Sequence, residues 1–177
     1  PEIEELAAQV RQQLVDPSID AISVQILSGI EGLKINGVAF DLFVGTEGVV
    51  HDEAGNPVLG ICEYDPGVPD TALVSVSPAS NQAGEALVLS TLGHELGHAI
   101  FDAPSWIGDA SKGPGLFDDP TELARKAYRT TTRDGDHLSK GAGHAATQQP
   151  RAGSNQIERD EYFAELRANE FMGSLLV

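Results

Sequence analysis

The sequence predicts an α+β fold in which a small, mostly antiparallel sheet packs against helices. The helical patterns lie in the first and last parts of the chain, and the strand patterns lie together between them. Strands that follow one another without an intervening helix favour antiparallel pairing. The chain has 177 residues, 41% of them hydrophobic, which is enough for one domain with its own core.

The N-terminal part is predicted to contain two helices. Apolar residues recur at helical spacing over residues 3–15, and Pro17 ends this helix. A second helix is expected over about residues 20–28, with Asp20 as its N-cap and Gly29 at its end.

The middle of the chain is predicted to form the strands. Residues 33–50 are rich in Val, Phe and Gly, which indicates strand structure. Residues 52–57 have the composition of a turn, so a hairpin is expected between residues 49–51 and 58–64. Residues 72–77 alternate as a strand does.

A long helix is expected over about residues 82–101, capped by Ser80 or Asn81. Apolar side chains recur along it at intervals of three and four residues, which predicts one buried face. These residues are Leu89, Leu92, Leu96 and Ile100.

The last third is predicted to be helices separated by loops. Residues 102–118 read as a loop, and Pro120 opens a helix over about residues 121–130. Residues 133–156 carry many small and polar residues, which predicts a mobile surface loop. A final helix is expected over about residues 157–176.

Charge and composition exclude several classes of function. The net charge of −16 argues against direct nucleic acid binding, where Lys and Arg supply the affinity, and it permits a basic protein partner. No apolar run approaches the roughly 20 residues of a membrane helix, so no membrane association is expected. The single cysteine, Cys62, fits a cytoplasmic protein and reads as a packed strand residue. Both ends look like boundaries within a longer protein, so flanking regions are expected.

Residues 94–98 read H-E-L-G-H, which is the pattern H-E-x-x-H. On a helix, residues four apart lie on the same face, so the imidazoles of His94 and His98 can reach one metal ion. Glu95 lies beside the first of them, where it can accept a proton from an attacking water molecule. The pattern therefore predicts a hydrolytic zinc site.

A catalytic zinc ion needs a third protein ligand, and spacing alone leaves several candidates. These are Asp102, His137, His144, Glu161 and Glu165. Gly93 and Gly97 form a smooth stripe on the same helix, so another backbone can approach it closely and bring the third ligand near the metal.

Other residues are candidates for supporting roles. Asp102 can orient a ligand imidazole, and Asn169 lies where it can support the site as well. Hydrolysis also needs a donor for the developing oxyanion. The candidates for that donor are Tyr128, His137, His144 and Tyr162.

Two segments resemble the ImmA/IrrE family of metallopeptidases. Residues 165–177, E-L-R-A-N-E-F-M-G-S-L-L-V, are similar to that family's E-x-x-A-N-x-F-x-x-x-L-L, and residues 91–98, T-L-G-H-E-L-G-H, to its T-L-A-H-E-L-G-H. The resemblance implies a single zincin-like domain over residues 1–177, with an insert at about 102–156. It also implies that Glu165 is the third ligand of one Zn²⁺ per chain, with Mn²⁺ as the alternative metal.

The resemblance further implies site-specific cleavage of a helix-turn-helix repressor in a stress or mobile-element response. The substrate is expected to lie as an added strand along an edge of the sheet. Two alternatives stay open: a toxin or effector protease with the same zinc site, and a non-catalytic, metal-stabilised sensor or binding module. A DNA-binding or a delivery module beside this domain would distinguish regulation from toxicity.

Overall fold

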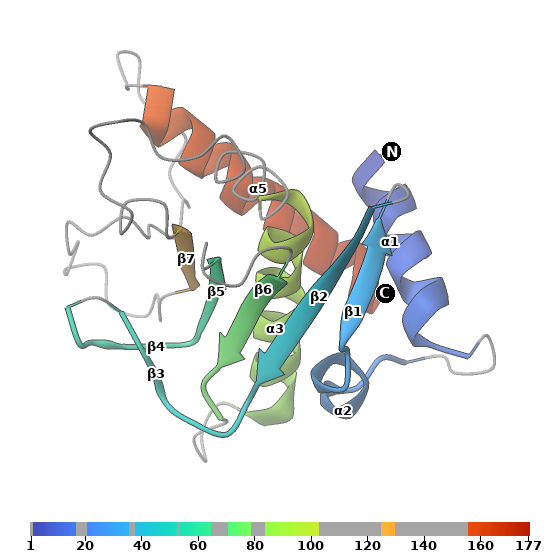
Figure 1. Ribbon diagram of the computed structural model, residues 1–177, viewed down its shortest axis with the longest axis horizontal. Helices are drawn as coiled ribbons and strands as arrows, with labels where there is room; N and C mark the ends of the chain where they lie inside the picture. Colours follow the sequence, from blue (N-terminus) through green and yellow to red (C-terminus); the bar gives the residue numbers. More distant parts are fainter. Residues whose placement is uncertain are drawn as a thin grey trace.

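The protein is a mixed α+β structure built from one main sheet and helices (Figure 1). The computed structural model describes residues 2–16, 21–35, 38–52, 54–64, 71–78, 84–102, 125–129 and 156–177. The described helices are α1 (Glu2–Leu14), α2 (Val24–Ser28), α3 (Gly84–Phe101) and α5 (Gln156–Leu176). None of the helices in these ranges has the length and apolar character needed to cross a bilayer.

Within the described residues, the main sheet has five strands in the order β1-β2-β6-β5-β7. They are β1 (Gly32–Ile35), β2 (Val38–Gly45), β5 (Gly60–Tyr64), β6 (Thr71–Val76) and β7 (Arg125–Arg129). Only β2 and β6 pair in parallel, and the other neighbours are antiparallel. The predicted α+β class and the mostly antiparallel sheet are therefore confirmed.

The N-terminal helices lie close to their predicted ranges. The predicted second helix is shorter than expected, because Ser23 acts as the N-cap: its hydroxyl oxygen accepts the backbone N–H of Ile26 at 3.3 Å. The prediction that Asp20 caps this helix is therefore wrong. Gly29 ends the helix as predicted. The predicted caps of the long helix, Ser80 and Asn81, lie outside the described residues, as do most of the predicted loops.

The turn after β3 (Val50–His51) is confirmed. One carboxylate oxygen of Asp52 accepts the backbone N–H of Ala54 at 3.0 Å and that of Asn56 at 2.7 Å, which closes the turn. The turn leads into β4 (Pro57–Val58), which pairs with β3 in a two-stranded sheet.

The predicted hairpin of residues 49–51 against 58–64 is wrong beyond Val58. Residues 60–64 form β5, which pairs with β6 and β7 instead. Ser77 redirects the chain at this point, because its hydroxyl donates to the Val58 carbonyl at 2.7 Å and its backbone N–H donates to the Leu59 carbonyl at 2.8 Å. These bonds hold the end of β4 against the end of β6, so the hairpin stops there.

The predicted helix over residues 121–130 is also wrong, because Arg125–Arg129 form strand β7. Residues such as Arg, Lys and Ala favour helices, but propensity is a weak preference that tertiary context overrides. Here the context is β5, whose five residues pair in antiparallel register with β7, from Gly60 opposite Arg129 to Tyr64 opposite Arg125.

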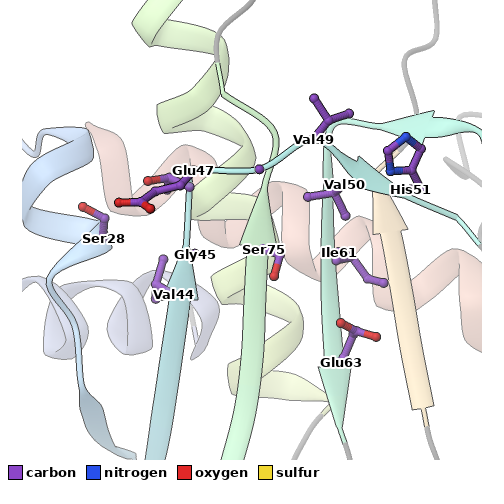
Figure 2. A pocket seen from close by; sticks show the side chains of 12 residues that line it. Ser28, Val44, Gly45, Glu47, Val49, Val50, His51, Ile61, Glu63 and Ser75 are labelled. Atoms are coloured by element: carbon purple, nitrogen blue, oxygen red, sulfur yellow. The ribbon is translucent and has the colours of Figure 1, made fainter.

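The outer face of the sheet, opposite α3, carries a shallow hollow of about 640 Å³ (Figure 2). Ser75, Ile61 and Glu63 line it from β6 and β5, and Glu47 borders it where the chain leaves β2. Phe43 of β2, whose side chain is exposed, directly precedes Val44, which lines the hollow. No residue of the predicted metal motif lines this hollow, so it is separate from the candidate site.

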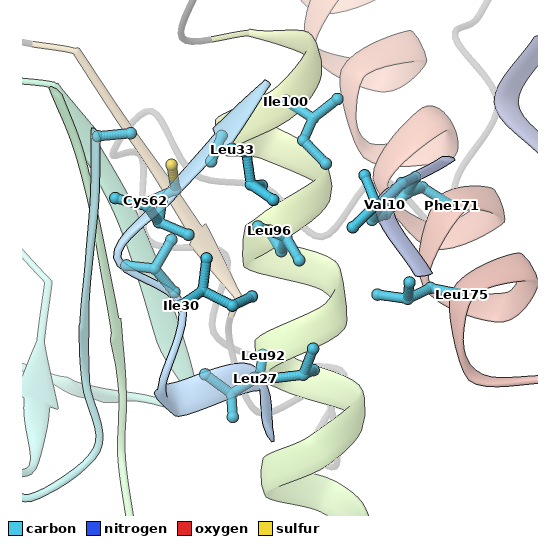
Figure 3. Close-up of a cluster of buried hydrophobic side chains, with 14 of the residues drawn as sticks. Val10, Leu27, Ile30, Leu33, Cys62, Leu92, Leu96, Ile100, Phe171 and Leu175 are labelled. Carbon is cyan, nitrogen blue, oxygen red and sulfur yellow. The ribbon is translucent and has the colours of Figure 1, made fainter. Parts of the chain in front are cut away.

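Helix α3 lies between the sheet on one side and α5 on the other (Figure 3). Leu92 and Leu96 of α3 join a core that includes Cys62 of the sheet and Phe171 and Leu175 of α5. The prediction gave α3 one buried face, but residues Thr91–Ile100 are buried all round because both neighbours cover the helix. Each large apolar side chain buried in this way stabilises the fold by about 1.5–3 kcal/mol.

The free edge of β1 is closed by a side chain from α1. The Gln13 amide accepts the backbone N–H of Lys34 at 3.2 Å and donates to the Lys34 carbonyl at 3.1 Å. It thus takes the bonds that another strand would make, which is one way proteins protect edge strands.

Candidate metal centre

Three motif residues on α3 are among the most deeply buried polar groups of the described chain. His94 and His98 are each 1% exposed and Glu95 is fully buried. Polar groups lose solvation when they are buried, so they need partners that repay this cost. The surroundings of these side chains therefore show what the site is built to hold.

Glycines on α3 let α5 approach closely enough to complete the site. A Cβ atom on Gly97 would lie 2.9 Å from the Cα of Ala168, and one on Gly93 would lie 3.2 Å from the Cγ of Met172. Real Cβ atoms essentially never come within 3.0 Å of another heavy atom. The predicted close packing at the glycine stripe is confirmed, and Glu165 lies one turn before Ala168 on α5.

Glu165 faces the two histidines. Its Oε2 lies 3.4 Å from His94 Nε2, its Oε1 lies 3.3 Å from His98 Nε2, and the two Nε2 atoms are 3.2 Å apart. Ligand atoms bound at about 2.0–2.1 Å to a tetrahedral zinc ion lie about 3.3–3.4 Å from one another. His94, His98 and Glu165 are therefore spaced to hold one metal ion.

Of the other proposed third ligands, Asp102 is the one whose side chain is described. Asp102 contacts the far side of the His98 ring and not the shared centre. His137 and His144 lie outside the described residues, and the side chain of Glu161 is likewise not among those described.

A hydrogen-bond chain fixes the orientation of the first histidine. Asn169 donates its amide N–H to the Glu165 backbone carbonyl at 2.9 Å, so its amide oxygen is the atom 3.1 Å from His94 Nδ1. That oxygen can only accept, so Nδ1 of His94 carries a proton and the Nε2 lone pair points to the shared centre. The supporting position predicted for Asn169 is confirmed.

A carboxylate holds the second histidine. Asp102 Oδ2 lies 2.7 Å from His98 Nδ1, and Arg167 Nη2 donates to Asp102 Oδ1 at 3.0 Å. A carboxylate that accepts from Nδ1 fixes the ring with its Nε2 toward the metal. Asp102 thus has the orienting position that the sequence predicted. Arg167 was missed, because a residue on a distant helix gives no local signal.

Without a bound metal ion, the pKa values of His98 and Glu165 both lie far from their usual values. Burial favours the neutral ring of His98, but hydrogen bonds to Asp102 and Glu165 outweigh it and raise the pKa of His98 to about 10. Burial also opposes ionisation of Glu165, but hydrogen bonds to His94 and His98 outweigh it and lower the pKa of Glu165 to about 2. Without a metal ion, a proton on His98 thus supplies positive charge beside the Glu165 carboxylate.

The charges around the site fit a divalent cation. Three buried carboxylates surround it, Glu95, Asp102 and Glu165, and Arg167 supplies one positive charge among the described contacts. A divalent ion would bring the sum to zero with both imidazoles neutral, which is the form that binds metal. The donor set of two nitrogens and one oxygen, with its spacing, fits zinc.

Glu95 lies against a notch in the sheet at Gly60. A Cβ atom on Gly60 would lie 2.9 Å from Glu95 Cγ, 3.0 Å from Glu95 Oε1 and 2.7 Å from Thr91 Cγ2. This role of Gly60 was not predicted from the sequence. A glycine inside a strand is a signal of close approach by another group, and it could have pointed here.

Other predicted residues have different outcomes. Cys62 is a buried strand residue, as predicted, and burial together with the charge of Glu95 raises the pKa of its thiol well above the usual range. The ring of Tyr162 packs edge-to-face on that of Phe163, with 5.4 Å between the ring centroids. The side chain of Tyr128 is not among those described, so the oxyanion donor stays a prediction.

No protein-family model matches the chain, and comparisons with curated proteins and with solved structures give no match. The resemblance to the ImmA/IrrE family therefore stays a prediction carried by the two motifs.

Proposed function

We propose that the chain is a zinc-dependent endopeptidase in which His94, His98 and Glu165 hold the metal ion. One observation carries the proposal: ligand atoms of these three buried residues lie within 4.8 Å of one another, beside the buried carboxylate of Glu95. A structural zinc site has no use for an adjacent base, whereas a hydrolytic site needs one. This resembles a zincin-like centre.

Each residue has a defined part in the reaction. When bound, a zinc ion would polarise the scissile carbonyl and would lower the pKa of an attacking water to about 7. Glu95 accepts the proton of that water and passes it to the leaving amine. Asn169 and Asp102 hold the two imidazoles in the tautomer that leaves Nε2 free for the ion.

The proposed substrate is a helix-turn-helix repressor, cut at one site. The resemblance to the ImmA/IrrE family supports this class of partner. The net charge of −16 supports it as well, because an acidic surface attracts a basic DNA-binding protein. If the substrate adds as a strand, the β1 edge is a poor place for it, since Gln13 already occupies the backbone groups of Lys34.

The first test is the variant Glu95→Gln, which keeps the shape of the side chain and removes the base. We expect it to fold and to bind zinc like the wild type, with cleavage of a peptide library reduced by about 10²–10⁴-fold. Zinc content is measured alongside the cleavage rate. Equal cleavage by the variant and the wild type would refute the role of Glu95.

The burial of the site favours a second candidate, a metal-stabilised sensor or binding module without catalysis. His94, Glu95 and His98 are all 1% exposed or less. For such a module, zinc would raise the melting temperature of the wild type and of Glu95→Gln equally, and neither protein would cleave any substrate. Cleavage by the wild type but not by Glu95→Gln would favour the peptidase over the sensor.

A further inference from the structure

Arg167 is the outermost member of a chain of contacts that ends at the candidate metal ligand His98. Its guanidinium donates to Asp102 Oδ1 at 3.0 Å, and Asp102 Oδ2 lies 2.7 Å from His98 Nδ1. Asp102 is 9% exposed, and each of its carboxylate oxygens has one of these two partners. The Arg167 side chain is 42% exposed, so this ion pair is partly buried, with its carboxylate end shielded from solvent.

The contact also joins the two helices that supply the ligands. Asp102 follows the end of α3, four residues after His98, and Arg167 is on α5, two residues after Glu165. The same pair therefore fixes the ring of one ligand and the position of the helix that carries another.

The two histidines are held by parallel arrangements. His94 is held by Asn169, whose amide is anchored to the Glu165 carbonyl at 2.9 Å. His98 is held by Asp102, and the group that anchors Asp102 is Arg167. Without its anchor, a carboxylate is free to rotate and its hydrogen bond to the imidazole is less well aligned.

We propose that Arg167 is a positioning residue of the metal centre and acts through Asp102. It keeps the Asp102 carboxylate aligned with Nδ1 of His98, so that Nε2 of His98 points to the ion. Its positive charge also helps to balance the three carboxylates of the site, because a divalent ion alone would offset only two of their three negative charges. This inference rests on the proposed metal centre and assigns it a residue that touches neither the ion nor its ligands.

The experiment is a double-mutant cycle read out as zinc affinity, with no need for a substrate. The variants are Arg167→Gln, Asp102→Asn and the two combined, and Arg159→Gln is the control because Arg159 is an exposed arginine on the same helix. The dissociation constant for Zn²⁺ is measured by competition with a chelator. The visible spectrum of the Co²⁺-loaded proteins reports the geometry of the site.

Asp102→Asn is expected to weaken zinc binding by about 10–100-fold, as loss of a group that orients a ligand does. Arg167→Gln is expected to weaken it less, by about threefold to tenfold, and to change the Co²⁺ spectrum. Arg167→Gln should add nothing in the Asp102→Asn background, because its only route to the ion is then gone. Arg167→Lys should restore part of the affinity, and Arg159→Gln should leave it unchanged.

A different pattern overturns the inference. If Arg167→Gln lowers the melting temperature of the metal-free protein but leaves the zinc affinity and the Co²⁺ spectrum unchanged, the pair is only a tie between helices. Equal losses in the wild-type and Asp102→Asn backgrounds would likewise exclude action through Asp102. Failure of the wild type to bind zinc would refute the metal centre itself, which is a separate and recognisable result.

Discussion

In the group His94, His98 and Glu165, the carboxylate of Glu165 is the ligand that comes from α5, and each of its oxygens faces a different histidine. The distances are 3.4 Å to His94 Nε2 and 3.3 Å to His98 Nε2. Two histidines one turn apart can bind metals weakly in many helices, so the carboxylate from α5 is what makes the group a three-donor site.

We therefore expect Glu165→Ala to weaken zinc binding beyond the roughly 10–100-fold that follows loss of a merely orienting group. The matched control is Glu170→Ala, since Glu170 is an exposed carboxylate on the same helix. Calorimetric titration with zinc gives both values. Wild-type affinity in Glu165→Ala would place the third ligand elsewhere, with His137 and His144 as the next candidates.

The stability of the metal-free protein should depend on pH through His98 and Glu165. The pKa of His98 is raised from 6.5 to about 10, so its contribution is complete below pH 6.5 and is lost as the pH rises through 10. The pKa of Glu165 is lowered from 4.5 to about 2, so its contribution is complete above pH 4.5 and is lost as the pH falls through 2. These two groups stabilise the fold most between pH 4.5 and 6.5.

Urea unfolding after removal of metal measures this dependence. The free energy of unfolding should fall between pH 6.5 and 10, and the variant His98→Gln should lack that part of the slope. Zinc should oppose the loss, because it binds the deprotonated rings. A flat profile for the metal-free wild type over this range would contradict the raised pKa of His98.

At the scale of elements, the site depends on how closely α5 packs against α3. Gly97 meets the backbone of Ala168, which cannot move aside as the end of a flexible side chain can. Arg11 of α1 donates to the Leu175 carbonyl at 2.9 Å and holds the other end of α5. A side chain at Gly97 would therefore shift α5 near Glu165.

We expect Gly97→Ala to destabilise the protein by about 1–3 kcal/mol through overpacking, and to weaken zinc binding at the same time. Gly173→Ala is the control, since a Cβ atom there would meet nothing within 4 Å. That change should stabilise the protein by up to about 1 kcal/mol, because Ala favours a helix over Gly. Thermal unfolding and zinc titration of both variants test this, and equal behaviour of the two would refute the role of close packing.

At the scale of the whole molecule, the charge of −16 should govern the encounter with a basic substrate. Long-range attraction accelerates association and is screened by salt. We expect cleavage of a helix-turn-helix repressor by the zinc-loaded protein to slow as the salt concentration rises, and DNA to compete by covering the basic face of the repressor. Cleavage rates over a salt series measure this.

Unrelated basic proteins of similar charge provide the control for that experiment. They should be cut poorly, because selectivity for one site requires more than attraction between charges. Equal cleavage of the repressor and of these proteins would favour the toxin or effector alternative over a regulatory peptidase.

The sequence by itself determined the long helices and the part of the candidate site that lies on α3. The repeat of apolar residues located α1 and α3, because a helix places side chains three and four residues apart on one face, and the final helix predicted over about residues 157–176 is α5. The same rule put His94 and His98 together, and the glycine stripe predicted the close neighbour. Glu165 came from the resemblance of its motif, since spacing alone left five candidates.

Only the tertiary structure decided the features that depend on contacts between distant segments. It made residues 125–129 a strand by pairing them with β5, and it ended the hairpin at Val58 through Ser77. It also brought Gly60 under Glu95 and Arg167 to Asp102. A local pattern records which face of an element is buried, but not which residue of another element will meet it. That pairing is fixed when sheet and helices pack together, because the energy then depends on the shapes and charges of both partners.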